Sequence, residues 1–381
     1  MPIRSSLRFG RVAGIEIGAS WSWLIIVAIV FFTLATSVFP ETNAGLSDAG
    51  YAAMAAAAVL LFFASLTAHE LGHAIQARRD GMEIDGITLW VFGGVARFRG
   101  EFPSAGAELR IALAGPVVSL VLGVVFLGAA LLVDLPSGVD GVVFWLGQIN
   151  LTLLVFNLLP ALPLDGGRVL RALLWIRRGN FAAATRTAAA MGRGFGQGLF
   201  VMGLVLVLVT GAFAGLWLAL IGLFLIGAAE AEGQMAETRD ALADLRVRDV
   251  MVAEPVSVPP DMALDRFMDE VFMAHRHTAY PVVGADGSPL GMVSFRQVVA
   301  LPREDWPRRT VRDVMVPIER AIVVRSDADL RGTYPRLATD GLRRALVQDH
   351  GQPLGLLSLT DVMRVLEAAG GRGARRLGGE P

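Results

Sequence analysis

Three ionisable side chains, His69, Glu70 and His73, lie in "LTAHELGHAIQARR", residues 66–79, at the end of a segment apolar enough to cross a membrane. An ionisable group in hydrocarbon costs roughly 2.5–3.5 kcal/mol on insertion scales, so three together indicate a function. Residues at i and i+4 share one face of a helix, which allows both imidazoles to bind one zinc ion. Glu70 then lies beside the ion, where it can take a proton from a water whose pKa zinc lowers to about 7.

The spacing is the HExxH arrangement of zinc hydrolases, and a chance match is the alternative. The chain has five histidines, of which His69 and His73 are the two in its apolar half. A catalytic zinc needs a third protein ligand. With no further histidine there and no cysteine, we expect a carboxylate. The candidate is Asp165 in "FNLLPALPLDGG", where prolines and glycines break an apolar segment. Its alternative role, an N-cap of the next helix, is compatible with binding a metal.

Membrane spans must position these residues. Of the 381 residues, 54% are hydrophobic and 18% are charged, the mean hydropathy is +0.55 and the net charge is −1. These values indicate a polytopic membrane protein and give no sign of a nucleic-acid partner. Segments of about 20 apolar residues are expected to span. Six candidates lie near 20–39, 51–77, 109–133, 141–159, 195–211 and 213–230. The last two adjoin at "TGAFAG", and a single tilted helix over 195–230 is the alternative.

The arginines give an independent prediction of topology, because cytoplasmic loops are enriched in basic residues. Arginines precede the first span and follow the second and fourth, whereas the intervening loops contain none. We therefore expect a multi-pass protein of the cell (inner or plasma) membrane with both termini in the cytoplasm. His69 would lie about 12 Å inside the cytoplasmic end of its span, at 1.5 Å per residue. Asp165 would lie at the cytoplasmic end of the fourth span, in the same leaflet.

At these residues the chain resembles the site-2 protease family of intramembrane zinc metalloproteases. The likeness rests on "HELGH" and on the N-x-x-P-x-x-x-x-D-G element in "FNLLPALPLDGG". It extends to "TLWVFGGVARF" and "ELRIALAGPVVS" and defines a transmembrane zinc metalloprotease domain over residues 1–231. The resemblance implies one zinc ion per chain, bound by His69, His73 and Asp165, with Glu70 as general base. It also implies that Asn157 holds the substrate or the oxyanion, whereas a polar contact between helices is the alternative role for this residue.

Two further segments of the membrane half contain paired small residues. Gly93 and Gly94, between β-rich stretches, predict a tight hairpin. It could be an ordinary cytoplasmic hairpin, or an edge strand at which Gly93 and Gly94 help to bind an unwound substrate by β-addition. The family resemblance favours the second interpretation. Around Gly115, in "ALAGPVVSL", we expect close packing of the third span rather than chemistry.

Beyond about residue 232 the composition is that of a soluble domain, and it contains a tandem duplication. "VRDVMV" at 247–252 recurs at 311–316, and "LGMVSFRQVV" at 290–299 matches "LGLLSLTDVM" at 354–363 at the same offset. The copies resemble a pair of CBS (cystathionine-β-synthase) domains, at 245–301 and 309–367, followed by a disordered tail at 368–381. The expected fold is thus a polytopic α-helical membrane protein of about six transmembrane helices with a short membrane-associated β-hairpin, plus a cytoplasmic α/β tandem CBS module.

The CBS resemblance implies binding of ATP or AMP between the copies. The ribose-binding pattern is present in the second copy as Ser358, Thr360 and Asp361, where the carboxylate can accept ribose hydroxyls. The first copy has Ser294 but departs from the pattern at Gln297. A dimerisation module without a ligand is the alternative.

The expected function is hydrolysis of a peptide bond in or near a transmembrane helix of another membrane protein, such as an anti-sigma-factor-like regulator. This is regulated intramembrane proteolysis, modulated here by adenine nucleotide. The expected partners are that substrate, the lipid bilayer and a second copy of the chain through the CBS domains. One alternative is a CBS-regulated membrane metal or ion transporter, in which the intramembrane His, Glu and Asp line an ion route. A catalytically silent scaffold without zinc is another.

Overall fold

The computed structural model describes residues 6–91, 93–100, 102–349 and 351–377. The chain divides into two compact units, Met1–Ala236 and Glu237–Pro381. The first contains the apolar helices up to Ala236, within the last of them, and the second contains the sequence duplication.

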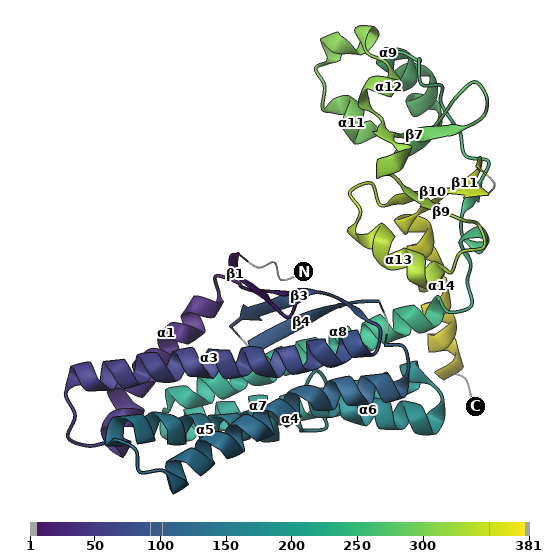
Figure 1. Cartoon of the computed structure of the whole chain (residues 1–381). Helices are drawn as coiled ribbons and strands as arrows, with labels where there is room; N and C mark the ends of the chain where they lie inside the picture. Colours follow the sequence, from purple (N-terminus) through teal and green to yellow (C-terminus); the bar gives the residue numbers. More distant parts are fainter. Residues whose placement is uncertain (1–5, 92, 101, 350, 378–381) are drawn as a thin grey trace. The chain divides into compact units, whose positions relative to one another are not determined.

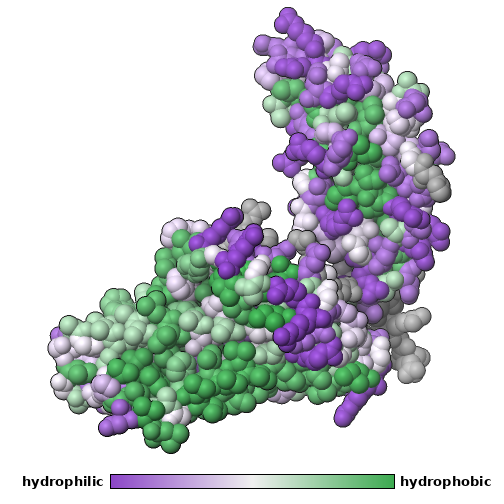
Figure 2. Space-filling view, in the orientation of Figure 1, coloured by the Kyte–Doolittle hydropathy of each residue, from purple (hydrophilic) through white to green (hydrophobic). Residues whose placement is uncertain are grey.

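In the described part of the chain, six helices are long and apolar enough to cross a membrane, as the sequence predicts. The first span combines α1 (Trp23–Thr33), η1 (Leu34–Val38) and α2 (Phe39–Thr42). The others are α3 (Asp48–Arg79), α4 (Ala105–Leu132), α5 (Ser137–Asn157), α7 (Phe181–Thr210) and α8 (Phe213–Ala241). Helices α3, α4 and α5 lie side by side (Figure 1). Apolar side chains cover much of the visible outer surface of these helices (Figure 2), as contact with lipid requires.

The long apolar stretch after residue 181 forms two helices, so the single-helix alternative is wrong. Helix α7 ends at Thr210, and the next residue, Gly211, adopts a left-handed conformation with φ of +65°. Glycine reaches this conformation without the steric cost that a Cβ would add, and the left-handed residue ends the helix. Helix α8 then begins at Phe213.

A four-stranded sheet packs on α3. Its strands are β1 (Leu7–Val12), β2 (Ile15–Ala19), β3 (Glu83–Trp90) and β4 (Gly93–Arg99), in that spatial order. The β2–β3 pair is parallel and the other two pairs are antiparallel. The predicted hairpin is thus half of a larger sheet, because the N-terminal segment adds two strands. Ile15 and Ile87 bury their side chains against Ala74 of α3, which fixes the sheet to the helix.

Trp90 of β3 pairs with Gly93 of β4. Gly93 and Gly94 therefore begin β4, and the predicted tight hairpin is present. Gly93 has φ of +131°, a conformation that favours glycine. Strand β4 is at the edge of the sheet.

A non-helical loop between α5 and α6 (Asp165–Arg178) positions the predicted carboxylate ligand. A Cβ at Gly166 would lie 2.2 Å from the Leu158 carbonyl oxygen, and one at Gly167 would lie 2.3 Å from the Leu162 nitrogen. Glycine is therefore required for α6 to begin so close to the preceding loop. Leu164 is the N-cap of α6 and Asp165 is its first residue, so the N-cap role considered for Asp165 is wrong.

The second unit is an α/β module, as the CBS resemblance predicts, and it contains two sheets. One has the order β5-β11-β10-β9, and the other has the order β6-β7-β8. The strands are β5 (Val252–Ala253), β6 (Ala279–Val283), β7 (Pro289–Ser294), β8 (Val316–Pro317), β9 (Ile322–Val324), β10 (Arg344–Asp349) and β11 (Gln352–Ser358). The helical segments are η2 (Val247–Asp249), α9 (Leu264–Arg266), η3 (Phe267–Phe272), α10 (Met273–His275), α11 (Phe295–Val299), η4 (Arg303–Arg308), α12 (Val311–Val314), η5 (Ile318–Arg320), α13 (Leu330–Thr339) and α14 (Leu359–Leu377).

The two copies exchange their opening segments. Strand β5 of the first copy pairs with β11 of the second, and β8 of the second pairs with β7 of the first. The cores follow the same rule, because Val247 packs among second-copy residues and Val311 packs among first-copy residues. Neither copy, as bounded in the sequence, therefore contains its whole core.

The C-terminal helix extends into the predicted disordered tail. Helix α14 continues to Leu377, so residues 368–377 are helical, whereas 378–381 lie outside the described residues.

Candidate metal centre

Helix α3 places the two imidazoles of the HExxH motif on one buried face. His69 and His73 are 2% and 3% exposed, and their Nε2 atoms lie 3.1 Å apart. The helix begins with a cap, in which the Ser47 hydroxyl accepts a hydrogen bond from the Gly50 N–H. Arg78 and Arg79 lie in its last turn, where positive charge interacts favourably with the helix dipole. The predicted i, i+4 geometry is therefore present.

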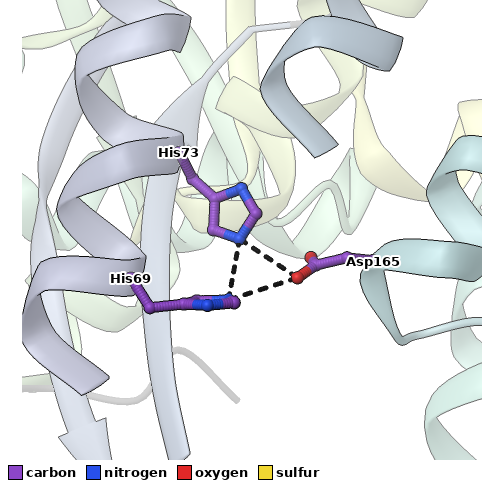
Figure 3. Close-up of side chains that lie close together, drawn as sticks. All are labelled: His69, His73 and Asp165. Carbon is purple, nitrogen blue, oxygen red and sulfur yellow. Dashed lines mark hydrogen bonds and ion pairs between the residues drawn. The ribbon is translucent and has the colours of Figure 1, made fainter. Parts of the chain in front are cut away.

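Asp165 completes a triangle of ligand atoms from a different part of the chain. Its Oδ2 lies 3.2 Å from Nε2 of His69 and 3.2 Å from Nε2 of His73 (Figure 3). All three side chains are buried, and their ligand atoms lie within 4.8 Å of one another. Because α6 begins directly against the preceding loop, its first residue, Asp165, lies next to the two imidazoles.

The hydrogen bonds of this triangle fit a divalent cation. Nδ1 of His73 lies 2.7 Å from the Ile111 carbonyl oxygen, which can only accept, so Nδ1 carries the proton. In the neutral ring, Nε2 of His73 then presents a lone pair. This lone pair, an Asp165 carboxylate oxygen and Nε2 of His69 lie close to one another, an arrangement in which all three can bind one divalent cation. Two imidazoles and one carboxylate form a known catalytic zinc ligand set.

Helix α4 supports the imidazoles with a row of residues that the sequence analysis did not assign to the site. Ile111 accepts from His73, and the Ser119 hydroxyl lies 2.9 Å from Nδ1 of His69. Gly115 lies between them, and a Cβ there would be 2.2 Å from Nε2 of His73 and 2.6 Å from Nε2 of His69. The expected close packing at Gly115 is therefore packing against the two imidazoles. Spacings of four residues place all three on one helix face, which was the available sequence signal.

We predict that Gly115→Ala lowers zinc affinity about 10–100-fold, the range seen when groups that orient metal ligands are changed. The added methyl group overlaps both imidazoles and must displace them from Asp165. Competition with a chelator on the purified full chain measures the effect. Gly128→Ala is the matched control, because it lies on the same helix and its Cβ would meet no described atom within 4 Å. Equal zinc affinity of the two variants would contradict the prediction.

Glu70 and strand β4 are in direct contact beside the two histidines. A Cβ at Gly94 would lie 2.4 Å from Cγ and 3.0 Å from Oε1 of Glu70. The absence of a side chain at Gly94 thus allows the edge strand to approach the carboxyl group. Glu70 is only partly buried, so its carboxylate remains accessible from the adjoining cavity.

That cavity has a volume of about 430 Å³, within the usual range for ligand pockets. Glu70 and the three predicted metal ligands line it together with Gly93, Gly94 and Asn157. The remaining walls are mostly apolar and aromatic, from α1, α3, α5, α8 and the β3–β4 hairpin. Asn157 is the last residue of α5, and among the described residues its side chain has no hydrogen-bond partner, so it makes no polar contact between helices here. Arg168, which the sequence analysis did not select, also lines the cavity.

The predicted nucleotide-binding residues lie together at the start of α14. The Ser358 hydroxyl accepts a hydrogen bond from the Asp361 N–H at 3.2 Å and also bonds the Asp361 carboxylate, while Thr360 is exposed. The other Asp361 oxygen lies 3.3 Å from Arg364. In the first copy, Ser294 and Gln297 form a capping box at the start of α11. The serine pattern therefore stabilises a helix start in both copies.

Comparisons with known proteins match both units. The model of peptidase family M50 matches residues 57–135 and 134–201, and the CBS domain model matches 247–304 and 311–368. The chain is 37% identical to the protein Rip3 of Mycobacterium tuberculosis over 369 residues, which are 96% of this chain and 94% of that protein. It is 30% identical to zinc metalloprotease MJ0392 of Methanocaldococcus jannaschii, over 95% of this chain and 96% of that protein.

Two solved structures are also similar to parts of the chain. The site-2 protease from Methanocaldococcus jannaschii has a TM-score of 0.43 and 30% identity, and the match covers 60% of this chain and 94% of that one. The CBS domain of a bacterial CNNM/CorC family Mg²⁺ transporter in complex with ATP has a TM-score of 0.32 and 22% identity, with 36% of this chain and 97% of that one covered.

Proposed function

Because the chain belongs to peptidase family M50, the site-2 protease family, we propose that it hydrolyses a peptide bond in or near a transmembrane helix of another membrane protein, with zinc held by His69, His73 and Asp165. The chain is a zinc metalloendopeptidase of the site-2 protease type, with tandem CBS domains and multiple membrane spans. This membership supports the protease hypothesis over the transporter and scaffold alternatives. The observation that carries the proposal is the convergence of two imidazoles and one carboxylate at 3.1–3.2 Å.

The residues of the cavity have separate roles in the proposed reaction. Bound zinc would polarise the scissile carbonyl and lower the pKa of a water molecule. Glu70 accepts a proton from the attacking water and returns it to the leaving amine, and its accessible position on the cavity wall suits both transfers. The Asn157 amide donates a hydrogen bond to the carbonyl oxygen as negative charge develops there. Its lack of another partner among the described residues supports this role.

Strand β4 is the proposed holder of the substrate. The carbonyls of a transmembrane helix are engaged in i→i−4 hydrogen bonds, so the scissile segment must unwind before it can react. On its side away from β3, the edge strand offers backbone donors and acceptors that can pair with an extended segment. Contact between Gly94 and Glu70 would bring that segment to the general base.

The proposed cleavage takes place in the cytoplasmic leaflet of the cell membrane, with both termini of the enzyme in the cytoplasm. The arginine distribution supports this orientation. The proposed substrates are single-span regulators of the anti-sigma-factor type. The purified chain in lipid vesicles, incubated with a panel of single-span membrane proteins, tests the proposal when product termini are sequenced. We expect cuts in the cytoplasmic third of the apolar segment. Cuts confined to soluble loops, or none in any panel member, would contradict it.

We further propose that ATP or AMP binds the CBS pair and modulates cleavage, and that the same module joins two copies of the chain. Ser358, Thr360 and Asp361 are the proposed ribose contacts. The capping bonds of Ser358 and the Arg364 contact of Asp361 show that both residues also have local partners. A bound nucleotide would therefore compete with these hydrogen bonds or donate to the remaining lone pairs of the same oxygens.

We predict that ATP stabilises the full chain against thermal unfolding, by about 2.7 kcal/mol at a concentration of 100 times Kd. Asp361→Ala should remove most of this shift, because it deletes the proposed acceptor of the ribose hydroxyls. Each variant is compared with its own ligand-free melting temperature, and Asp286→Ala, in an exposed turn of the first copy, is the control. An unchanged shift in Asp361→Ala would exclude this ribose site. No shift in the wild type would favour the ligand-free dimerisation module.

A further inference from the structure

A buried cluster of charges links the helix of the proposed carboxylate ligand to two other helices. Arg171 of α6 donates from Nε to Oε1 of Glu108 on α4 at 2.6 Å, and its second terminal nitrogen lies 2.5 Å from the same oxygen. Its other terminal nitrogen lies 3.0 Å from Oε2 of Glu232 on α8. The side chains of Arg171 and Glu108 are 4% and 0% exposed. The guanidinium also lies over the ring of Phe181, 5.0 Å from its centre.

A contribution to stability alone does not explain this buried cluster. Burying a charge pair costs so much solvation energy that apolar replacements of equal volume are often neutral or stabilising. Oε2 of Glu108 is buried and has no hydrogen-bond partner among the described residues, which adds to the cost. A buried charge pair can instead give the fold specificity, because its directional hydrogen bonds fix one helix against another.

Helix α4 is in contact with both halves of the candidate metal centre through one row of residues. Ile111, Gly115 and Ser119 contact the imidazoles of α3, as described above. Glu108 lies one turn before Ile111, on the same face, and bonds Arg171. Arg171 is six residues after Asp165 in α6, less than two turns away. The same surface of α4 therefore contacts the two imidazoles and, through Arg171, the helix that contains Asp165.

We propose that Glu108 and Arg171 are positioning residues, which hold the start of α6 in the register that brings Asp165 to His69 and His73. Glu232 of α8 supports them, because its carboxylate forms an ion pair with the other terminal nitrogen of the Arg171 guanidinium. Helix α6 follows a loop that contains two prolines, and its close start at Gly166 and Gly167 fixes one end, while the bonds of Arg171 fix it to α4 and α8. A displacement of about 1 Å at Asp165 would remove it from a zinc ligand distance of about 2.0–2.2 Å. This inference rests on the proposed function, because it assumes that these three residues bind zinc.

The test is a double-mutant cycle on zinc affinity, measured by chelator competition with the purified full chain. Glu108→Gln should lower zinc affinity about tenfold in the wild-type background, which is the lower end of the range for groups that orient metal ligands. In the Asp165→Asn background the same change should have less than about a twofold effect, because Glu108 acts through that carboxylate. Arg171→Lys should restore only part of the loss seen in Arg171→Met, since lysine lacks the two-sided fork of the guanidinium.

Controls and opposing outcomes separate this inference from the proposed function. Arg177→Gln removes an exposed arginine from the same helix and should leave zinc affinity unchanged. An equal loss from Glu108→Gln in both backgrounds, or no loss in either, would overturn the positioning role while the zinc site stands. Absence of zinc from the wild type would overturn the proposed function and this inference together. If Glu108→Gln does not fold, Glu232→Gln, at a carboxylate that is 34% exposed, takes its place in the cycle with the same expectations.

Discussion

Glu70→Gln is expected to lower turnover about 10²–10⁴-fold and to leave zinc bound, because it removes the proposed general base and none of the proposed ligands. The amide has nearly the shape of the carboxylate, so its contact with Gly94 of β4 is preserved. Substrate cleavage in lipid vesicles and metal content of the same preparation are measured together. The substrate is a single-span protein that the wild type cuts.

The matched control for this variant is Glu41→Gln, an exposed carboxylate of α2 far along the chain from the motif. It should retain both zinc and turnover. Wild-type turnover in Glu70→Gln would exclude Glu70 as the base. Loss of zinc along with turnover would instead make Glu70 a metal ligand, as the transporter alternative expects.

Asp165→Asn is expected to lower zinc affinity more than about 100-fold, beyond the 10–100-fold typical of groups that only orient ligands. The substitution keeps the shape of the side chain but removes the negative charge that lies 3.2 Å from each imidazole. A neutral amide oxygen is a much poorer zinc ligand than a carboxylate. Turnover should fall with zinc occupancy and return in part when zinc is added in excess.

Asp134→Asn, in an exposed loop between α4 and α5, controls for the loss of one negative charge. His69→Ala and His73→Ala should resemble Asp165→Asn, because each removes one of the three proposed ligands. Near-normal zinc affinity in Asp165→Asn with loss in both histidine variants would mean that another group supplies the third ligand.

The parts of the candidate site that sequence reasoning found are those that local spacing encodes. The i, i+4 imidazoles follow from helix geometry, and the apolar composition of the segment made the motif informative. Elimination predicted a carboxylate as the third ligand, because the apolar half of the chain has no third histidine and the chain has no cysteine, and the break at the prolines and glycines after the fourth span selected Asp165. The six spans follow from hydropathy and agree with the alternation of arginines.

The supporting residues could not be found in the same way, since they act through contacts between distant segments. Ile111 contributes only its backbone carbonyl, which any residue would present. Gly115 and Ser119 are ordinary packing residues of transmembrane helices, and their role appears only once α4 lies against α3. Glu108 preceded the predicted third span, and nothing local connected it with Arg171.

The missed features of the fold have the same origin. Strands β1 and β2 are short and form a hairpin of their own, and β3, which pairs with β2, lies more than sixty residues away, so no local signal places that hairpin in the sheet. In the CBS module, the sequence repeat could not reveal that β5 and β8 pair across the two copies. Pairing partners are a property of the folded sheet, not of the repeat unit.

The most direct test of the central claim is anomalous diffraction at the zinc absorption edge from crystals of the full chain grown without chelator. We predict one strong peak per chain, about 2.0–2.2 Å from Nε2 of His69, Nε2 of His73 and an oxygen of Asp165. No peak at this triangle, or a zinc ion bound by other residues while Asp165 lies away from the two imidazoles, would contradict the account.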